Sequence, residues 1–220
     1  MSTRSMAKKL AFSAVMMAVS AVIYTVSGLI PFLNLPFGGT VTVASLLPII
    51  IVAYMYGVKW GAFTAFSYSL LRVALSLMQG ASGAVTALFL PGSDFTVVKA
   101  LAIVFLDYIA AYSVLFVGGL FRKMKSQTAA LLLGSIVALI CSLAFHVISG
   151  AVFYGEWAEW FFTETSFANL KISAAIMENA GASLGLVYSL IYNSCYMIPE
   201  TVITAICAAF VSRIPQIKKC

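Results

Sequence analysis

Residues 128–153 read TAALLLGSIVALICSLAFHVISGAVF and contain no acidic residue, no lysine and no arginine. A helix needs about 20 mostly apolar residues to cross the ~30 Å hydrocarbon core of a bilayer, and this stretch is long enough to do so. It holds the single histidine of the chain, His146. The stretch therefore predicts a membrane-spanning helix with one imidazole in its second half.

The composition extends this interpretation to the whole chain. Of its 220 residues, 62% are hydrophobic and only 9% are charged, which excludes an ordinary soluble domain. We expect an all-α integral membrane protein in the lipid bilayer, with one domain over residues 1–220 and six transmembrane helices. Their expected ranges are 10–30, 40–56, 61–78, 97–120, 128–153 and 185–211.

Lysine and arginine gather at alternate ends of these spans. One side holds Lys99 and Lys171, whereas the other holds ten basic residues, namely Arg4, Lys8, Lys9, Lys59, Arg122, Lys123, Lys125, Arg213, Lys218 and Lys219. Cytoplasmic loops carry the excess of positive charge, so we expect both termini in the cytoplasm and two long outer connections, 79–96 and 154–184. Because the basic residues do not form one patch, the net charge of +6 does not indicate nucleic-acid binding.

Polar side chains in four of the spans share a depth. At about 1.5 Å per residue, Asp107 and His146 lie in the outer half of the membrane, as do Tyr188 and Asn193 in the first turns of the sixth span. Thr40 and Thr42 enter the second span from the same side. A carboxylate among aromatic rings suits a flat, cationic heteroaromatic ligand, and an asparagine reads its hydrogen-bonding edge. The pattern predicts a small-molecule pocket on the outer side.

Each of these residues also has a purely structural interpretation. His146 can be an interhelical hydrogen-bond partner, and Tyr188 can be a packing or interfacial aromatic residue. Asp107 can be neutralised by Arg72 on a neighbouring span. Glu200 follows Pro199 and can hydrogen-bond around the kink that proline causes.

The motifs bear on the class of protein. No Gly-x-x-x-x-Gly-Lys-Ser/Thr phosphate loop and no Cys-x-x-Cys pair occurs, so we expect no ATPase, no metal site and no cofactor. An intramembrane enzyme that uses His146 with Asp107 or Glu200 stays open as an alternative, although neither a His-Glu-x-x-His nor a paired-aspartate motif supports it. The aromatic residues at the outer side count against a passive channel.

One face of the first span carries small residues. Ala14 and Ala18 are four residues apart, and such pairs let two membrane helices approach closely. The face either packs internally or docks a membrane partner.

Five segments resemble one known family. They are SAVMMAVSA, PFGGTVTVASLLPI, FLDYIAAYSVLFVGGLFR, FHVISGAVFYGEW and VYSLIYNSCYMIPE, and together they resemble the thiamine-specific substrate-binding (S) subunits of energy-coupling factor (ECF) transporters. The likeness covers nearly the whole chain except the two long outer connections. Its specific part is the His-x-x-x-Gly segment combined with Tyr-Ser-x-x-Tyr-Asn.

The resemblance implies a non-enzymatic, multi-pass protein of the bacterial plasma membrane that binds thiamine from outside with high affinity. It implies partners as well: a transmembrane coupling subunit and two ABC-type ATPase subunits. It implies partner contact through Ala14 and Ala18. It also implies a thiamine pocket, formed by Asp107, Tyr108, His146, Tyr154, Tyr188 and Asn193.

Three positions depart from the family pattern. Some members have glutamate where this chain has Asp107, some have tryptophan at the position of Tyr154, and another expected tryptophan aligns with Gly39. The outer connections carry insertions, in which Trp157 or Trp160 could replace a missing stacking wall. The alternative ligand is therefore another vitamin or a thiamine precursor.

Overall fold

The computed structural model describes residues 3–35 and 39–217, so Lys218 and Lys219 of the basic C-terminal cluster lie outside the described residues. Within these ranges the chain is helical and forms no strand; the isolated bridge there joins Asn34 and Thr40. The all-α prediction is confirmed.

The helical elements follow one another along the chain, and the stretch between η1 and α2 is a longer connection. η3 is a π-helical turn, and the other elements labelled η are 3₁₀-helical. The bounds are α1 (Thr3–Gly28), η1 (Pro31–Leu33), α2 (Leu47–Tyr56), α3 (Val58–Met78), η2 (Gly80–Ser82), α4 (Ala84–Ala87), α5 (Val97–Val104), η3 (Phe105–Ala110), α6 (Ala111–Ser113), η4 (Val114–Lys123), α7 (Gln127–Phe153), η5 (Gly155–Trp157), α8 (Ala158–Glu164), η6 (Ser166–Asn169), α9 (Lys171–Asn179), η7 (Gly181–Ser183) and α10 (Leu184–Val211).

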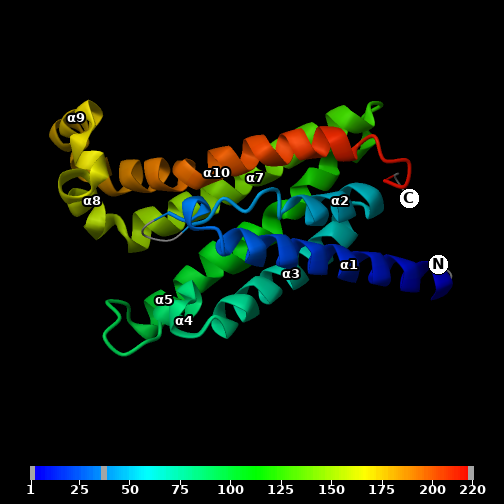
Figure 1. Cartoon of the computed structure of the whole chain (residues 1–220), viewed down its shortest axis with the longest axis horizontal. Coiled ribbons are helices and arrows are strands. Elements are labelled where there is room, and N and C mark those ends of the chain that lie inside the picture. The colour runs from blue at the N-terminus through cyan, green and yellow to red at the C-terminus, as the bar shows by residue number, and fades with distance from the viewer. Residues whose placement is uncertain (1–2, 36–38, 218–220) are drawn as a thin grey trace.

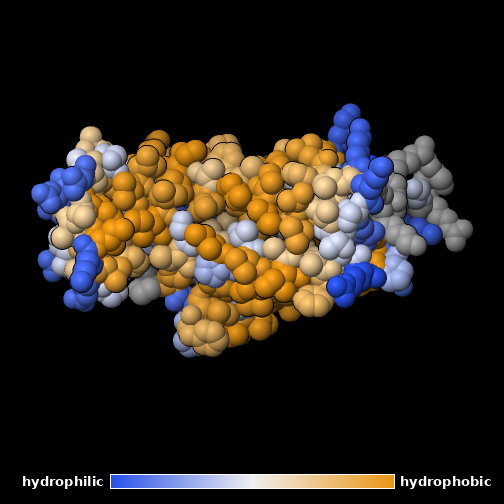
Figure 2. All heavy atoms as spheres, turned by 90° about the horizontal axis from the view of Figure 1, so that it is seen from above, coloured by the Kyte–Doolittle hydropathy of each residue, from blue (hydrophilic) through white to orange (hydrophobic). Residues whose placement is uncertain are grey.

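In the described part of the chain, five helical stretches are long and apolar enough to cross a membrane. They are Ser5–Gly28, Val58–Met78, Val97–Lys123, Gln127–Phe153 and Gly181–Val211. The chain is therefore a multi-pass membrane protein. Its helices form an elongated bundle with both termini at one end and α4, α8, α9 and the start of α5 at the other (Figure 1). Hydrophilic residues gather mainly at the two ends, with an apolar band between them (Figure 2).

The second expected span is shorter than predicted. Its helix, α2, begins at Leu47 and has 10 residues, so the prediction of helix from residue 40 was wrong at that end. Val43 and Ala44 have positive φ values of 49° and 64°, which no α-helix contains and which are unusual for a β-branched residue. Pro48 then stands in the first turn of α2, where its missing N–H is tolerated.

Glu200 on α10 holds the irregular turn before α2. Its carboxylate accepts hydrogen bonds from the backbone N–H of Thr42 at 2.7 Å and from the Thr204 hydroxyl at 3.3 Å. The side chain is 1% exposed. Instead of serving only the kink at Pro199, as the sequence suggested, the carboxylate pairs a backbone donor that would otherwise be costly inside a membrane.

Helix α2 lies at the centre of the bundle. Its residues Ile49, Ile50, Val52 and Tyr54 are fully buried, and it contacts α1, α3, η4, α7 and α10. A helix that is apolar on every face is buried on every face. At its end, Arg122 donates to the carbonyl oxygens of Tyr54 and Met55, both at 3.1 Å, which pairs two of the orphan carbonyls of the last turn.

Candidate functional site

The predicted site centres on Asp107, which lies in the π-helical turn η3. Such turns are rare and often occur at functional sites. One carboxylate oxygen of Asp107 is 2.9 Å from Nδ1 of His146, and the other accepts a hydrogen bond from Ser149 at 2.7 Å. An ionised carboxylate only accepts hydrogen bonds, so Nδ1 of His146 donates. The contact joins η3 to α7.

Asn193 extends this network to α10. Its Nδ2 donates to the backbone oxygen of Ser189 at 2.8 Å and makes a longer contact, 3.4 Å, with the backbone oxygen of His146. Its Oδ1 accepts from the Tyr196 hydroxyl at 2.7 Å. The Tyr196 ring is 6.1 Å from the His146 ring. Tyr196 and Ser149 were not predicted as site residues. The available signal for Tyr196 was its place in a row with Tyr188 and Tyr192, at successive intervals of four residues on one helix face.

Tyr154 lies where the two long outer connections meet. Its ring is 5.1 Å from Phe95, of the first connection, and 5.6 Å from Trp157, of the second. Burial and the nearby Asp107 carboxylate raise the pKa of Tyr154, so its phenol stays protonated. Trp157, one of the two tryptophans in the insertion, therefore lies next to the predicted site residue Tyr154. Nothing in the sequence pointed to Phe95.

Tyr188 is buried against α8. Its ring is 5.0 Å from Phe161 of α8 and 6.0 Å from Tyr192 on its own helix. Tyr188 and Tyr154 pack in the same hydrophobic cluster. It therefore forms the side of the site that the second outer connection covers.

Tyr108 and Tyr112 line the opposite side. Their ring centroids are 6.1 Å apart, and the Tyr112 ring is 6.0 Å from His146. Arg72 donates to the Tyr112 hydroxyl at 2.8 Å. Among the described residues the ion-pair partner of Asp107 is His146, so the structure does not bear out the alternative in which Arg72 neutralises Asp107.

Gly39 explains one departure from the family pattern. It has a φ of +83°, and a Cβ added there would lie 2.7 Å from a carbon of the Tyr196 ring. A tryptophan cannot occupy this position unless Tyr196 moves. The loop before α2 thus packs directly against the site.

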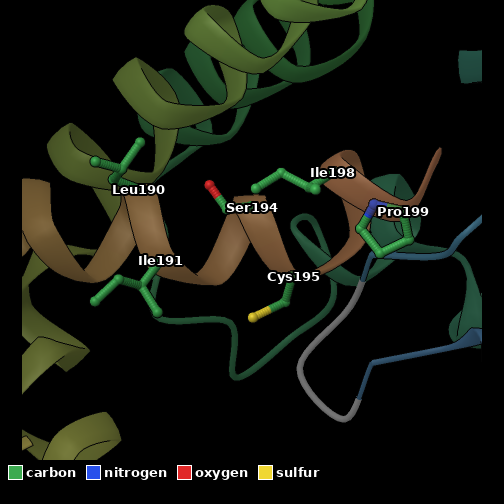
Figure 3. Close-up of a pocket in the computed structure, with 6 residues that line it drawn as sticks. All are labelled: Leu190, Ile191, Ser194, Cys195, Ile198 and Pro199. Carbon is green, nitrogen blue, oxygen red and sulfur yellow. The ribbon is translucent and has the colours of Figure 1, made fainter. Parts of the chain in front are cut away.

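A groove elsewhere on α10 is separate from this network. It is lined by Leu190, Ile191, Ser194, Cys195, Ile198 and Pro199 (Figure 3). Its side chains are almost all apolar, and none of the predicted site residues lines it. We interpret it as a surface for lipid tails. Among the described residues, no group of three or more His, Cys, Asp or Glu side chains could hold a metal ion.

Comparisons with known proteins agree on one family. The family described as thiamine transporter protein (Thia_YuaJ) matches residues 10–160, which include Asp107, His146 and Tyr154. The thiamine transporter ThiT of Bacillus subtilis (strain 168) is 29% identical over 203 residues, which cover 88% of this chain and 84% of that protein.

A solved structure shares the fold. ThiT from Listeria monocytogenes superposes with a TM-score of 0.56 over 93% of this chain and 97% of its own, at 15% sequence identity. The match of the family over more than half of the sequence is the deciding observation. This chain belongs to the thiamine transporter protein family, Thia_YuaJ.

Proposed function

We propose that this chain is the thiamine-binding S subunit of an ECF-type vitamin uptake transporter in the bacterial plasma membrane. The observation that supports this proposal best is that His146 and Ser149 orient the Asp107 carboxylate among several tyrosine side chains. Asp107 offsets the charge of the cationic thiazolium ring. Tyr108 and Tyr154 contact the ligand rings, and Tyr188 closes the side beneath α8.

Asn193 reads the aminopyrimidine edge in this proposal. Its Nδ2 contact with the His146 carbonyl is 3.4 Å long, which is weaker than an ordinary hydrogen bond. The Ser189 hydroxyl oxygen lies 3.1 Å from the same nitrogen, so a ligand acceptor competes with the Ser189 hydroxyl and the His146 carbonyl for one N–H group, while the bond to the Ser189 backbone oxygen stays in place. The bond from Tyr196 meanwhile keeps the amide in one orientation.

The proposed topology is one six-helix domain over residues 1–220 with both termini in the cytoplasm. Five crossings are the five long helical stretches, and α2 together with the irregular turn before it makes the remaining one, second in chain order. The turn is needed because the ten residues of α2 rise only about 15 Å, which is too short to cross the membrane alone. Support comes from the placement of both termini at one end of the bundle (Figure 1) and from the basic residues on that side.

Isothermal titration of the purified chain with thiamine tests the ligand. We expect saturable binding of one thiamine per chain with a dissociation constant below about 1 μM, at least 8 kcal/mol of binding free energy. A hydroxymethylpyrimidine-type precursor should compete weakly, because it lacks the cation that Asp107 recognises. Absence of binding at micromolar thiamine would show that thiamine is not the ligand. Tighter binding of the precursor would identify the precursor as the ligand instead.

Energy for uptake comes from partners in this proposal: an ECF transmembrane coupling subunit and two ABC-type ATPase subunits, since the chain lacks a phosphate-binding loop. Ala14 and Ala18 are exposed on α1. The buried stripe of that helix consists instead of Ser13, Ser20 and Ser27. The alanines are therefore available for close packing with the coupling subunit.

Ala18→Trp should reduce recovery of the coupling subunit in co-purification by roughly tenfold or more, since losing about 1.4 kcal/mol of packing already has that effect. Thiamine binding by the isolated chain should not change. Ala74→Trp is the matched control, because Ala74 is also an exposed alanine, on α3. Equal recovery of the coupling subunit with both variants would show that Ala18 does not contact it.

A further inference from the structure

Basic residues gather where the start of α1 meets the turn between α2 and α3, at the end of the bundle that carries both termini (Figure 1). Lys9 lies on α1, and Lys59 lies in the first turn of α3. Residues 1–93 contain no aspartate and no glutamate. Neither α1, α2 nor α3 therefore supplies a carboxylate that could offset this positive charge.

Two aromatic rings fix the position of Lys9. Its Nζ lies 5.4 Å from the centre of the Tyr56 ring and 5.9 Å from that of Trp60, so both rings make cation–π contacts. The Trp60 indole N–H donates to the Ser13 hydroxyl at 2.9 Å, which orients that ring. The membrane orientation of a protein requires only that basic residues lie on the cytoplasmic side, so orientation does not explain why Lys9 is held at the seam between α1 and α3.

η4 brings a third cation to the same turn. A Cβ added at Gly57, the residue between α2 and α3, would lie 3.7 Å from Nη1 of Arg122. Residues 108–155, which include η4, also contain no acidic residue. Cations from three elements thus lie around one turn, and we call them the basic cluster: Lys9, Lys59 and Arg122.

An apolar stripe runs from the basic cluster along the outside of α3. Phe63, Phe66 and Leu70 follow Lys59 at intervals of four, three and four residues, which places all four on one helix face. The three apolar side chains are 57%, 48% and 48% exposed. From Lys59 to Leu70 the helix rises about 16 Å, close to half of the ~30 Å hydrocarbon core. The stripe therefore spans one leaflet, with a cation at its polar end.

We propose that the basic cluster and the apolar stripe form a binding site for one anionic phospholipid. The phosphate lies at the basic cluster, and an acyl chain lies along the stripe. Charge complementarity selects the headgroup, because a zwitterionic lipid carries a cation that the cluster repels, whereas phosphatidylglycerol has a net negative charge. In the proposed topology the lipid comes from the cytoplasmic leaflet, whose surface is negative.

A lipid in this site would connect separate parts of the bundle. Its phosphate neutralises cations that are carried by α1, α3 and η4 and that otherwise repel one another. A ligand that binds only the folded state stabilises it. Added phosphatidylglycerol should therefore raise the melting temperature of the wild type in detergent more than that of a variant without the lysines.

The test is the dissociation constant of the first lipid bound to the purified full-length chain, measured by native mass spectrometry. The wild type should bind phosphatidylglycerol at least about tenfold more tightly than phosphatidylcholine. Lys9→Gln/Lys59→Gln should weaken phosphatidylglycerol by about 25-fold, because each basic residue near an anionic surface contributes roughly fivefold. Binding of phosphatidylcholine should change by less than about threefold.

Lys99→Gln/Lys171→Gln is the matched control. It removes the same charge from two exposed lysines at the opposite end of the bundle (Figure 1), and it should keep the wild-type affinity for phosphatidylglycerol. Lys9→Arg/Lys59→Arg keeps both charges and should stay within about threefold of the wild type. If Lys9→Gln/Lys59→Gln does not fold, Lys59→Gln alone changes only an exposed side chain and should weaken phosphatidylglycerol by about fivefold.

Three results would overturn the site. The first is a wild type that binds both phospholipids equally. The second is an equal loss in the two glutamine double variants, which would assign the preference to net charge instead of the basic cluster. The third comes from glycerol 3-phosphate, which has the headgroup chemistry without acyl chains: if it binds as tightly as phosphatidylglycerol, the occupant is a free phosphate and the apolar stripe has no part in binding.

Discussion

Asp107→Asn is expected to weaken thiamine binding by at least about 100-fold, or about 2.7 kcal/mol. Close charge pairs in desolvated interfaces couple by about 1.5 to 7 kcal/mol, and the substitution removes the negative member of the proposed pair. Asparagine is nearly the same shape as aspartate, and its oxygen can still accept from Ser149, which now donates at 2.7 Å. The measurement is the dissociation constant of purified protein for thiamine.

A neutral analogue separates charge from shape. With the thiazolium replaced by an uncharged ring, the same variant should bind the analogue within about threefold of the wild type, since no charge pair is lost. Equal losses for thiamine and the analogue would show that Asp107 only maintains the network with His146 and Ser149.

Glu200→Gln is the control for removing a buried carboxylate. Glu200 is bonded to the turn before α2 and not to the Asp107 network. The variant should unfold at a lower temperature but keep the wild-type preference for thiamine over the neutral analogue. A change in that preference would mean that the turn at residues 42–45 reaches the ligand.

The long helices could be predicted because the sequence features that specify them lie within the helices themselves. The stretch predicted at 128–153 is helical over Gln127–Phe153, and length, apolar composition and flanking polar residues suffice for such a prediction. The break before α2 could not be predicted in this way. It depends on Glu200, 158 residues along the chain from Thr42, and an apolar sequence alone does not report that contact.

The candidate site likewise has a part that could be predicted from the sequence and a part that could not. Depth along separate spans predicted that Asp107 and His146 lie at one level, and the structure places them in contact. Depth does not say which way a helix face points. For that reason the pairing of Arg72 with Asp107 stayed an open alternative in the sequence, whereas in the structure Arg72 lies between the Tyr24 and Tyr112 rings. Phe95 was not expected at all.

Gly134→Ala is expected to destabilise the fold. A Cβ at Gly134 of α7 would lie 2.6 Å from the backbone oxygen of Gly118 in η4, and backbone atoms cannot rotate away. Overpacking of this kind costs about 1 to 3 kcal/mol, against about 1 kcal/mol that alanine gains in helix propensity. The melting temperature in detergent should fall by about 5 °C. Gly28→Ala, with no atom within 4 Å of the added Cβ, should not lower it.

The same variant tests whether this contact positions the site. Gly118 lies on the helical path that carries Asp107, and Gly134 lies on the helix that carries His146, so a wedge between them can separate the two side chains. A ligand stabilises the folded state by RT ln(1 + [L]/Kd), so the rise in melting temperature with saturating thiamine should be smaller in Gly134→Ala than in Gly28→Ala. Equal rises would show that the strain stays local, and that Asp107 and His146 are held together by their own network alone.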